Sequence, residues 1–274
     1  MIEPTVRIRP ARGWEAIDFR ELWEFRELVV FLSWRDVKVR YKRAALGIAW
    51  AVLQPLMSMI IFTVIFGRVA GLPSEGLPYP LFTFAGIVPW QLFSASVSSA
   101  SNSLVGSAQL LSKVYFPRLI IPLASVGATV VDFAVGLLML AALMAWYQHA
   151  PTAAVFFLPL FVLLALIIAV GIGLWTSALT VRYRDVQYVL PFAMQVLLLA
   201  SPVAYSADVV PQGAMRVVYA VNPLVGLIQG FRWTLLGTEP PGSTIIVSIA
   251  AALILFVSGL MVFRRMEATF ADVV

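Results

Sequence analysis

The sequence has 274 residues, of which 61% are apolar and 12% are charged, and its formal net charge is +5. Soluble domains contain roughly 45–50% apolar and about 25% charged residues, so the apolar excess here must face lipid. Cysteine is absent and His149 is the single histidine, which excludes disulfides, thiol catalysis and a zinc site built from these ligands. The first twenty residues are polar and arginine-rich, so no cleavable signal peptide is expected.

An all-α integral membrane protein with six transmembrane helices is predicted. The fifth of the apolar segments is short and contains Pro191 and Pro202, but it approaches the minimum spanning length. A further apolar stretch, 217–236, contains Asn222-Pro223 and Arg232, which would be costly against lipid, so an external re-entrant hairpin is expected over about 206–237. The six predicted spans are 47–66, 81–104, 120–147, 155–181, 189–205 and 243–263.

Positive charges predict the orientation of the spans, because cytoplasmic loops collect lysine and arginine near span ends. With six spans and an internal N-terminus, all but three of the 19 basic residues fall inside, the exceptions being Arg68, Arg216 and Arg232. A seventh span would place Arg264 and Arg265 outside. The expected organisation has both termini cytoplasmic, with an N-terminal region at 1–46, a transmembrane domain at 47–263 and a tail at 264–274.

The segment before the first span predicts an amphipathic helix at the membrane interface. Its basic residues would meet anionic lipid headgroups. The helix is either a passive anchor or part of the entry route for a lipid substrate. Its apolar stripe contains Trp23, Val30, Trp34, Val37 and Tyr41, and its basic stripe contains Arg35, Lys38 and Lys42.

No energy source for transport, neither an ATP-binding site nor a set of ion-coupling residues, is recognisable in this sequence. A G-x-x-x-x-G-K-[ST] phosphate loop does not occur, and Lys113, the one lysine after Lys42, follows Leu111-Ser112 rather than glycine. Ion-coupled carriers usually hold several ionisable residues inside their spans, whereas here Asp132 is the one charge deep in a predicted span. That carboxyl is either a substrate or proton site or a group satisfied by a neighbouring hydroxyl or another helix.

The second span is rich in small hydroxyl residues in its second half. Such residues allow close helix approach and hydrogen bonds between helices. The alternative is a polar face toward a conduit, and a helix lining a pore between two subunits would do both. The candidates for this face recur near helical spacing and are Gln91, Ser94, Ser98 and Asn102.

The internal loop 105–118 is short and amphipathic, and it places aromatic rings beside basic residues. Exposed aromatic and basic side chains suit a docking surface for another protein. The other reading is an interfacial turn whose Lys113 and Arg118 reach toward water. The candidate docking residues are Gln109, Leu110, Ser112, Lys113, Val114, Tyr115, Phe116, Pro117 and Arg118.

Several motifs occur in order along nearly the whole chain, from about Phe19 to Phe270-Ala271-Asp272-Val273. They are Arg40-Tyr41-Lys42 through Leu46-Gly47 to Trp50 and Gln54-Pro55, Lys113-Val114-Tyr115-Phe116-Pro117-Arg118 with Pro122, Val181-Arg182-Tyr183-Arg184-Asp185-Val186, and Asn222-Pro223 with Gly230-Phe231-Arg232. In these motifs the sequence resembles the permease subunits of type-2 ABC exporters. The branch it resembles exports O-antigen, teichoic acid and related polysaccharides.

The resemblance implies a homodimer with a channel at its interface and two copies of a separate nucleotide-binding subunit on the cytoplasmic side. That subunit would bind ATP and Mg, so no cofactor, metal or catalytic site is expected in this chain. The substrate would be an undecaprenyl-linked polysaccharide, and the location the bacterial cytoplasmic (inner) membrane. Membrane lipids are expected as partners and nucleic acid is not.

Roles for particular residues follow from the same resemblance. Loop 105–118 would be the coupling helix seated in the ATPase, with a second cytoplasmic loop at Arg182, Tyr183, Arg184 and Asp185. The interfacial helix, including Arg40, would act in a lateral gate. Sugars stack on aromatic faces, so Phe62, Phe66, Trp90 and Phe93 are channel-lining candidates, and the external gate would contain Asn222, Pro223, Gln229 and Arg232.

Three other functions are compatible with the sequence. A drug or small-lipid exporter would have the same fold. A membrane-bound transferase or hydrolase would have to use Asp132. A passive scaffold for an envelope complex would need no transport path.

Overall fold

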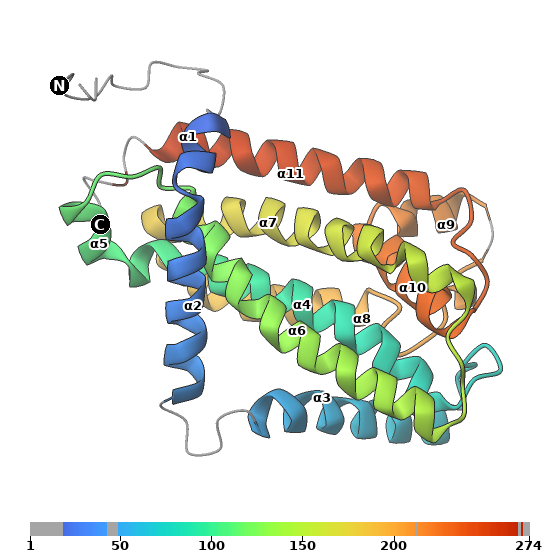
Figure 1. The fold of residues 1–274 in the computed structure, drawn as a ribbon. Coiled ribbons are helices and arrows are strands. Elements are labelled where there is room, and N and C mark those ends of the chain that lie inside the picture. Colours follow the sequence, from blue (N-terminus) through green and yellow to red (C-terminus); the bar gives the residue numbers. More distant parts are fainter. Residues whose placement is uncertain (1–18, 43–48, 212, 268–269, 271–274) are drawn as a thin grey trace.

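The computed structural model describes residues 19–42, 49–211, 213–267 and 270, and these residues form helices joined by short loops (Figure 1). The predicted boundary at 46/47, the Leu46-Gly47 pair and residues 1–18 and 43–46 of the predicted N-terminal region lie outside the described residues. The α-helices are α1 Phe19–Glu24, α2 Arg26–Lys42, α3 Ala49–Phe62, α4 Tyr79–Gly106, α5 Ala108–Lys113, α6 Ile120–Trp146, α7 Leu158–Arg182, α8 Val186–Leu199, α9 Ala214–Ala220, α10 Pro223–Leu236 and α11 Ile245–Glu267. A π-helix η1 (Thr63–Val69) and 3₁₀-helices η2 (Ala153–Phe157) and η3 (Ala207–Val209) complete the set.

Five helical segments of the described chain are long and apolar enough to cross a membrane: α3 with η1, α4, α6, η2 with α7, and α11. The predicted all-α membrane class is confirmed. The helix α8 is apolar but has only 14 residues, and it ends at Leu199, short of the predicted Tyr205. The pair α9 and α10 is bent by 90° at Val221 and Asn222, as a re-entrant hairpin requires.

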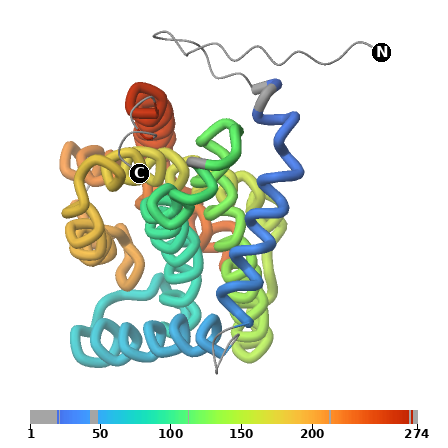
Figure 2. The backbone as a smooth tube through the Cα atoms, turned by 90° about the vertical axis from the view of Figure 1, so that its left-hand side faces the viewer, coloured from blue at the N-terminus to red at the C-terminus, as the bar shows by residue number. Residues whose placement is uncertain are grey.

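The loops between the long helices gather at two ends of the bundle. At one end, which we call the base, an apolar cluster joins parts of the chain that are far apart in sequence. Figure 2 views the molecule from this side, with α2 along one flank of the bundle. The buried members of the base cluster are Leu32, Leu104, Phe116, Leu119, Ile120, Ile121, Ala124, Leu174, Ala178, Val181, Phe263 and Phe270.

The opposite end, which we call the hairpin end, holds α9 and α10 (Figure 1). Polar contacts join its loops: the Tyr79 hydroxyl donates to the Ala204 carbonyl, and the His149 ring lies 2.9 Å from the Leu236 carbonyl oxygen. Val181 lies at the base and Ala204 at the hairpin end, so the chain between them, which contains α8, crosses from one end to the other. This path agrees with α8 as the remaining span of a six-span chain.

The helix α4 lies at the centre of the bundle, where it packs against α6, α7 and α10, and more than half of its residues are buried. The outer helices expose large apolar side chains such as Leu138, Phe156 and Ile254, as expected for surfaces that face lipid. A short apolar helix such as α8, with Phe192 and Val196 exposed, is suited to the same environment.

Two glycines set the distance between α7 and α11. A Cβ added at Gly259 would lie 2.2 Å from the Gly171 carbonyl oxygen, and one added at Gly171 would lie 2.7 Å from Phe256 Cα. These positions therefore have no room for a side chain, and they let the two backbones touch. Close approach of this kind is a usual source of helix association in membranes, where burial of apolar groups gives little gain over lipid.

Candidate functional site

The loop that follows α4 has an inner and an outer face. Phe116 is 5% exposed and packs in the base cluster, and Arg118 donates a hydrogen bond to the Glu267 carbonyl at the end of α11. The outer face presents Gln109, Lys113, Val114 and Tyr115, the last of which is 63% exposed, while Leu110 and Pro117 are half-buried. For Ser112 only the backbone is described, within α5. The loop is thus anchored to α11 and leaves basic and aromatic groups free.

The second loop at the base, between α7 and α8, exposes all four of its predicted residues: Arg182, Tyr183, Arg184 and Asp185. The Arg182 guanidinium lies over the Tyr183 ring, 5.4 Å from its centroid. The residue before them, Val181, belongs to the base cluster that also contains Phe116. The two loops predicted to be cytoplasmic therefore share one end of the protein.

The helix α2 runs crosswise to the long helices (Figure 1) and packs against α6. The Ser33 hydroxyl donates to the Ala124 carbonyl at 2.9 Å. A Cβ added at Gly127 would lie 2.5 Å from Ser33 Oγ, so glycine is needed for this approach. Trp23 and Trp34 are exposed, and the Lys38 ammonium lies 5.5 Å from the centroid of the Trp34 ring. The indole rings of Trp23 and Trp34, which were predicted to lie at the membrane interface, are thus exposed and able to contact lipid.

Asp132, the predicted intramembrane charge, is paired with the end of α2. It forms a salt bridge with Arg40 and accepts a hydrogen bond from the Tyr41 hydroxyl. Burial and this hydrogen bond raise the pKa of Tyr41 to about 12, so the hydroxyl stays protonated and donates. Arg40 also lies 3.5 Å from Ser99 Oγ on α4. The sequence suggested a hydroxyl or helix partner for Asp132 but gave no sign of Arg40, 92 residues earlier.

The hydroxyl residues of α4 fall into two sets. Ser96 and Thr129 are 2.6 Å apart, and Ser101 and Thr180 are 2.9 Å apart, so this set joins α4 to α6 and α7. The other set faces outward: Ser98 and Asn102 are exposed, while Gln91 and Ser94 are half-buried. Hydrogen bonds between helices therefore account for the first set, while the second set forms a polar face for which a role in a conduit stays a prediction.

The aromatic channel-lining candidates are less exposed at the surface of the subunit than the polar ones. Trp90 and Phe93 are buried inside the subunit, with ring centroids 5.6 Å apart. Phe62 and Phe66 are half-buried and pack edge to face, also at 5.6 Å. Among the predicted lining residues of α4, only the polar ones reach the surface of the subunit. We call these residues the polar stripe: Gln91, Ser94, Ser98 and Asn102.

At the hairpin end, Asn222 caps α10: its side-chain oxygen accepts from the Leu224 amide at 3.1 Å, and its amide donates to Ser201 Oγ at 2.9 Å. Pro223 takes the first helical position, where its missing N–H costs nothing. The bend between α9 and α10 thus keeps its backbone groups bonded, which the interior of a membrane demands.

Arg232 is 1% exposed, and it joins three segments at the hairpin end. Its guanidinium donates to the carbonyls of Phe82, Val203 and Tyr205, at 3.3, 2.8 and 3.2 Å. The cation also lies 3.6 Å from the centroid of the Phe82 ring. The residues that follow α8 are not helical, and Arg232 supplies donors to carbonyls there.

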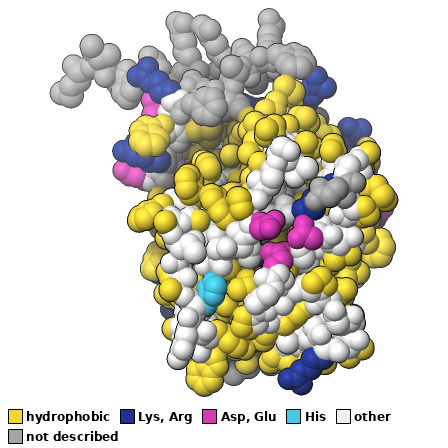
Figure 3. Space-filling model, turned by 90° about the vertical axis from the view of Figure 1, so that its right-hand side faces the viewer, with side chains coloured by type: hydrophobic (Ala, Val, Ile, Leu, Met, Phe, Trp, Pro, Cys, Tyr) yellow, Lys and Arg dark blue, Asp and Glu magenta, His cyan; other side chains and the backbone are white. Residues whose placement is uncertain are grey.

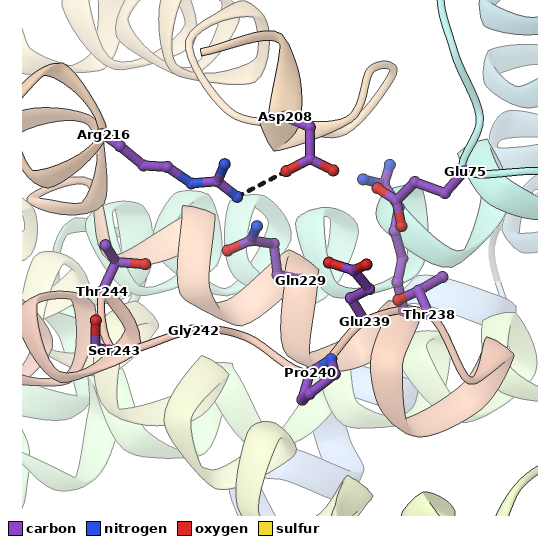
Figure 4. Close-up of a pocket in the computed structure, with 11 residues that line it drawn as sticks. Glu75, Asp208, Arg216, Gln229, Thr238, Glu239, Pro240, Gly242, Ser243 and Thr244 are labelled. Atoms are coloured by element: carbon purple, nitrogen blue, oxygen red, sulfur yellow. Dashed lines mark hydrogen bonds and ion pairs between the residues drawn. The ribbon is translucent and has the colours of Figure 1, made fainter. Parts of the chain in front are cut away.

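A pocket of about 230 Å³ lies beside Arg232 (Figure 4). The half-buried Gln229 lines it, as do three carboxylates that no sequence motif indicated: Glu75, Asp208 and Glu239. Acidic side chains gather on this face of the molecule (Figure 3). Asp208 pairs with Arg216 at 2.8 Å, and Ser206 Oγ donates to Glu75 at 2.6 Å. The three carboxylates come from separate loops, so their spacing in the sequence could not reveal that they line one pocket.

A bundle of apolar helices, with an outward polar stripe on its central helix and a bent pair of short helices at one end, is the arrangement of a multi-pass membrane protein. Residues 27–236, from α2 to the end of α10, match the family model described as ABC-2 type transporter. The chain belongs to this family.

Curated relatives align along almost the whole chain. An O-antigen export system permease protein, RfbA, from Myxococcus xanthus is 27% identical over 256 residues, which cover 92% of this chain and 97% of the relative. A protein of the same name from Klebsiella pneumoniae is 27% identical over 248 residues, covering 90% and 95%. The polysialic acid transport protein KpsM from Escherichia coli is 25% identical over 241 residues, covering 85% and 91%.

Replacing Arg232 with methionine is expected to destabilise the hairpin end. The change leaves buried carbonyls without donors, and each such group costs about 1–3 kcal/mol. We expect the free energy of unfolding to fall by about 3 kcal/mol or more. The measurement is the thermal unfolding temperature of the detergent-solubilised protein, which should fall accordingly. As the control, Arg216→Gln breaks a pair whose Asp208 side chain is 60% exposed, and about 1 kcal/mol or less is expected. Equal effects of the two changes would contradict the role given to Arg232.

Proposed function

We propose that this chain is the permease subunit of an ATP-driven exporter of a lipid-linked polysaccharide, and that two copies form a channel together with two separate ATPase subunits. The observation that carries the proposal is the polar stripe on α4. A polar face at membrane depth is costly against lipid, so it calls for a partner surface or a water-filled path. A second copy of the chain would enclose this face.

The nature of the cargo is inferred from the relatives. Three of them are named for the export or transport of O-antigen or polysialic acid, and each aligns with at least 85% of this chain. The match includes both the base loops and the hairpin, so it is not confined to a generic membrane segment. Export of a polysaccharide made on a lipid carrier is the function that agrees with these similarities.

The base is proposed to face the cytoplasm of a bacterial inner membrane. The described residues at or near the base include many basic side chains, which favours the cytoplasmic side. The hairpin end instead presents Glu75, Asp208 and Glu239. The basic residues of the base helices and loops include Arg26, Arg35, Lys38, Arg40, Lys42, Lys113, Arg118, Arg182, Arg184, Arg264 and Arg265.

The loop after α4 is proposed to seat in the ATPase. Lys113 and Tyr115 would contact the partner, while Phe116 and Arg118 would pass its movement to the base cluster and to α11. ATP and Mg would be held by the partner. This chain would contribute the docking surface, the path and the external hairpin.

Loss of the gene tests the cargo. We expect a strain without this protein to lose its surface polysaccharide and to accumulate the lipid-linked polymer inside the cell, because synthesis continues while export stops. Surface glycan is measured by extraction and gel analysis, and the internal polymer by mass spectrometry of membrane lipids. A plasmid copy of the gene is the control and should restore export. Intact surface polysaccharide without internal polymer would favour a drug or small-lipid exporter of the same fold.

The docking surface is tested by the double substitution Lys113→Ala and Tyr115→Ala. Both side chains are exposed, so the fold should keep its thermal stability while binding of the ATPase weakens by about tenfold or more, as at a protein interface anchor. Co-purification with the ATPase and substrate-stimulated ATP hydrolysis are the measurements. The matched control is Phe156→Ala, an 85% exposed aromatic away from the base loops. Unchanged binding and export in the double variant would remove the loop from the coupling role.

A further inference from the structure

A groove of about 450 Å³ opens between α2, α4 and α6 at the base of the bundle. One part of its lining is apolar and includes Leu32, Val39 and Ile121. Another part is polar and includes Arg35 and Arg40 of α2 with Ser99 and Asn102 of α4. Apolar and cationic surfaces thus meet where a crosswise helix joins the spanning helices.

The polar part of the groove is rich in hydrogen-bond donors. The Ser99 hydroxyl lies 3.5 Å from an Arg40 nitrogen and can donate its own proton elsewhere. The Asn102 amide donates one N–H to the Ser98 carbonyl at 3.0 Å, and its second N–H is available. Among the ionisable groups that line the groove, Arg35 and Arg40 outnumber Asp36, which pairs with Arg35. An anionic group with several acceptor oxygens would meet complementary donors here.

Arg40 lies between two possible anionic partners. It forms part of the groove, and it pairs with Asp132, which is not among the residues that line the groove. The pair is partly open, with the Arg40 and Asp132 side chains 37% and 29% exposed. A guanidinium binds phosphate oxygens through two parallel N–H bonds, so a phosphate in the groove would compete with the carboxylate for Arg40.

We propose that this groove binds the phosphate or pyrophosphate head of a lipid, with Arg40 shared between that head and Asp132. The proposal rests on the proposed function, in which the cargo is attached to a lipid. The apolar wall would take the first part of the hydrocarbon chain, and Ser99 and Asn102 would donate to phosphate oxygens. Asp132 acts as an internal substitute for the phosphate when the groove is empty of lipid.

When a lipid phosphate replaces Asp132 as the partner of Arg40, an exchange of partners takes place that also changes how α2 is held. When a lipid phosphate takes Arg40, Asp132 keeps the hydrogen bond from Tyr41, while the salt bridge between α2 and α6 is weakened. The contact between Ser33 and Ala124 holds the middle of α2 in place. Arrival of the lipid head is therefore signalled at the C-terminal end of α2, just before the chain enters the first span.

Two substitutions should change lipid affinity in opposite directions. Asp132→Asn removes the competing charge, so we expect binding of undecaprenyl pyrophosphate to tighten by about tenfold, since one favourable charged contact of about 1.4 kcal/mol is worth a factor of ten. Arg40→Gln removes the shared donor and should weaken binding at least tenfold. A purely structural salt bridge predicts the same direction for both variants, because either change breaks the same contact.

The measurement uses the full chain with its ATPase subunit in nanodiscs of neutral lipid, titrated with undecaprenyl pyrophosphate and followed by native mass spectrometry. Arg68→Gln, which removes an exposed cation from η1, is the charge-matched control and should leave the affinity unchanged. Thermal unfolding of each variant reports its folding, and Arg40→Lys replaces Arg40→Gln if the latter does not fold. Lysine keeps the charge but lacks the planar fork, so weaker binding is expected here too.

Two further titrations identify the source of the phosphate. Binding of undecaprenyl pyrophosphate without phosphatidylglycerol supports a site for the cargo lipid, and comparable binding of both supports a site for bilayer phospholipids. Equal affinity for inorganic pyrophosphate would show that the apolar wall contributes nothing, and would overturn the lipid assignment. A shift in the same direction for Asp132→Asn and Arg40→Gln would overturn the exchange. Neither result would affect the gene-loss test, so the inference can fail while the proposed export function stands.

Discussion

The hairpin end depends on how backbone carbonyls are satisfied where helices stop within or near a membrane. Water is scarce there, so a carbonyl that leaves a helix needs a donor from the protein. Arg232 provides two such bonds, to the Val203 and Tyr205 carbonyls after α8, and a third bond to the Phe82 carbonyl in the first turn of α4. A buried cation is otherwise expensive, and contact with the Phe82 ring offsets part of that cost. With this residue in place, α10 can lie inside the bundle instead of crossing it.

The two ends of the protein are held by different kinds of contact, and this difference suits different tasks. The base is an apolar cluster in which α2, the loop after α4 and the ends of α7 and α11 meet. Apolar contacts have no fixed direction, and the Arg118 hydrogen bond ties the loop to α11, so a movement of the loop would be passed on to the cluster and to that helix. The hairpin end is a network of directed hydrogen bonds, which fixes position more strictly. Movement at the base and restraint at the hairpin are what an ATP-driven gate requires.

The sequence predicted the class, the main helices and the bent hairpin because each depends on local features. Long apolar runs identify spans, and the Asn222-Pro223 pair with Arg232 identifies a segment that lipid would not tolerate. The Asn222 cap and the Pro223 start of α10 follow from residue chemistry alone. The length of α8 was predicted less well, because its apolar composition continues beyond Leu199 into residues that bond to Arg232 instead of continuing the helix.

Contacts between distant segments could not be read from the sequence. The partners of Asp132 come from another helix, and nothing in the spacing of Arg40 and Tyr41 points to it. Similarly, Glu75 and Asp208 approach Arg232 from two loops, and Arg118 reaches the carbonyl of Glu267 through the folded base. The serine-rich half of α4 was ambiguous for the same reason, since only packing decides which hydroxyls join helices and which form the polar stripe.

The central claim is that α9 and α10 enter and leave on one side of the membrane, opposite the base. The chain has no cysteine, so single cysteines report cleanly on exposure. Val209→Cys and Glu239→Cys flank the hairpin, and Tyr115→Cys marks the base; all three native side chains are exposed. With a membrane-impermeant maleimide on intact spheroplasts, we expect labelling at 209 and 239 and none at 115 until the membrane is permeabilised. Labelling of 209 and 239 from opposite sides would show that the pair crosses the membrane and would contradict this account.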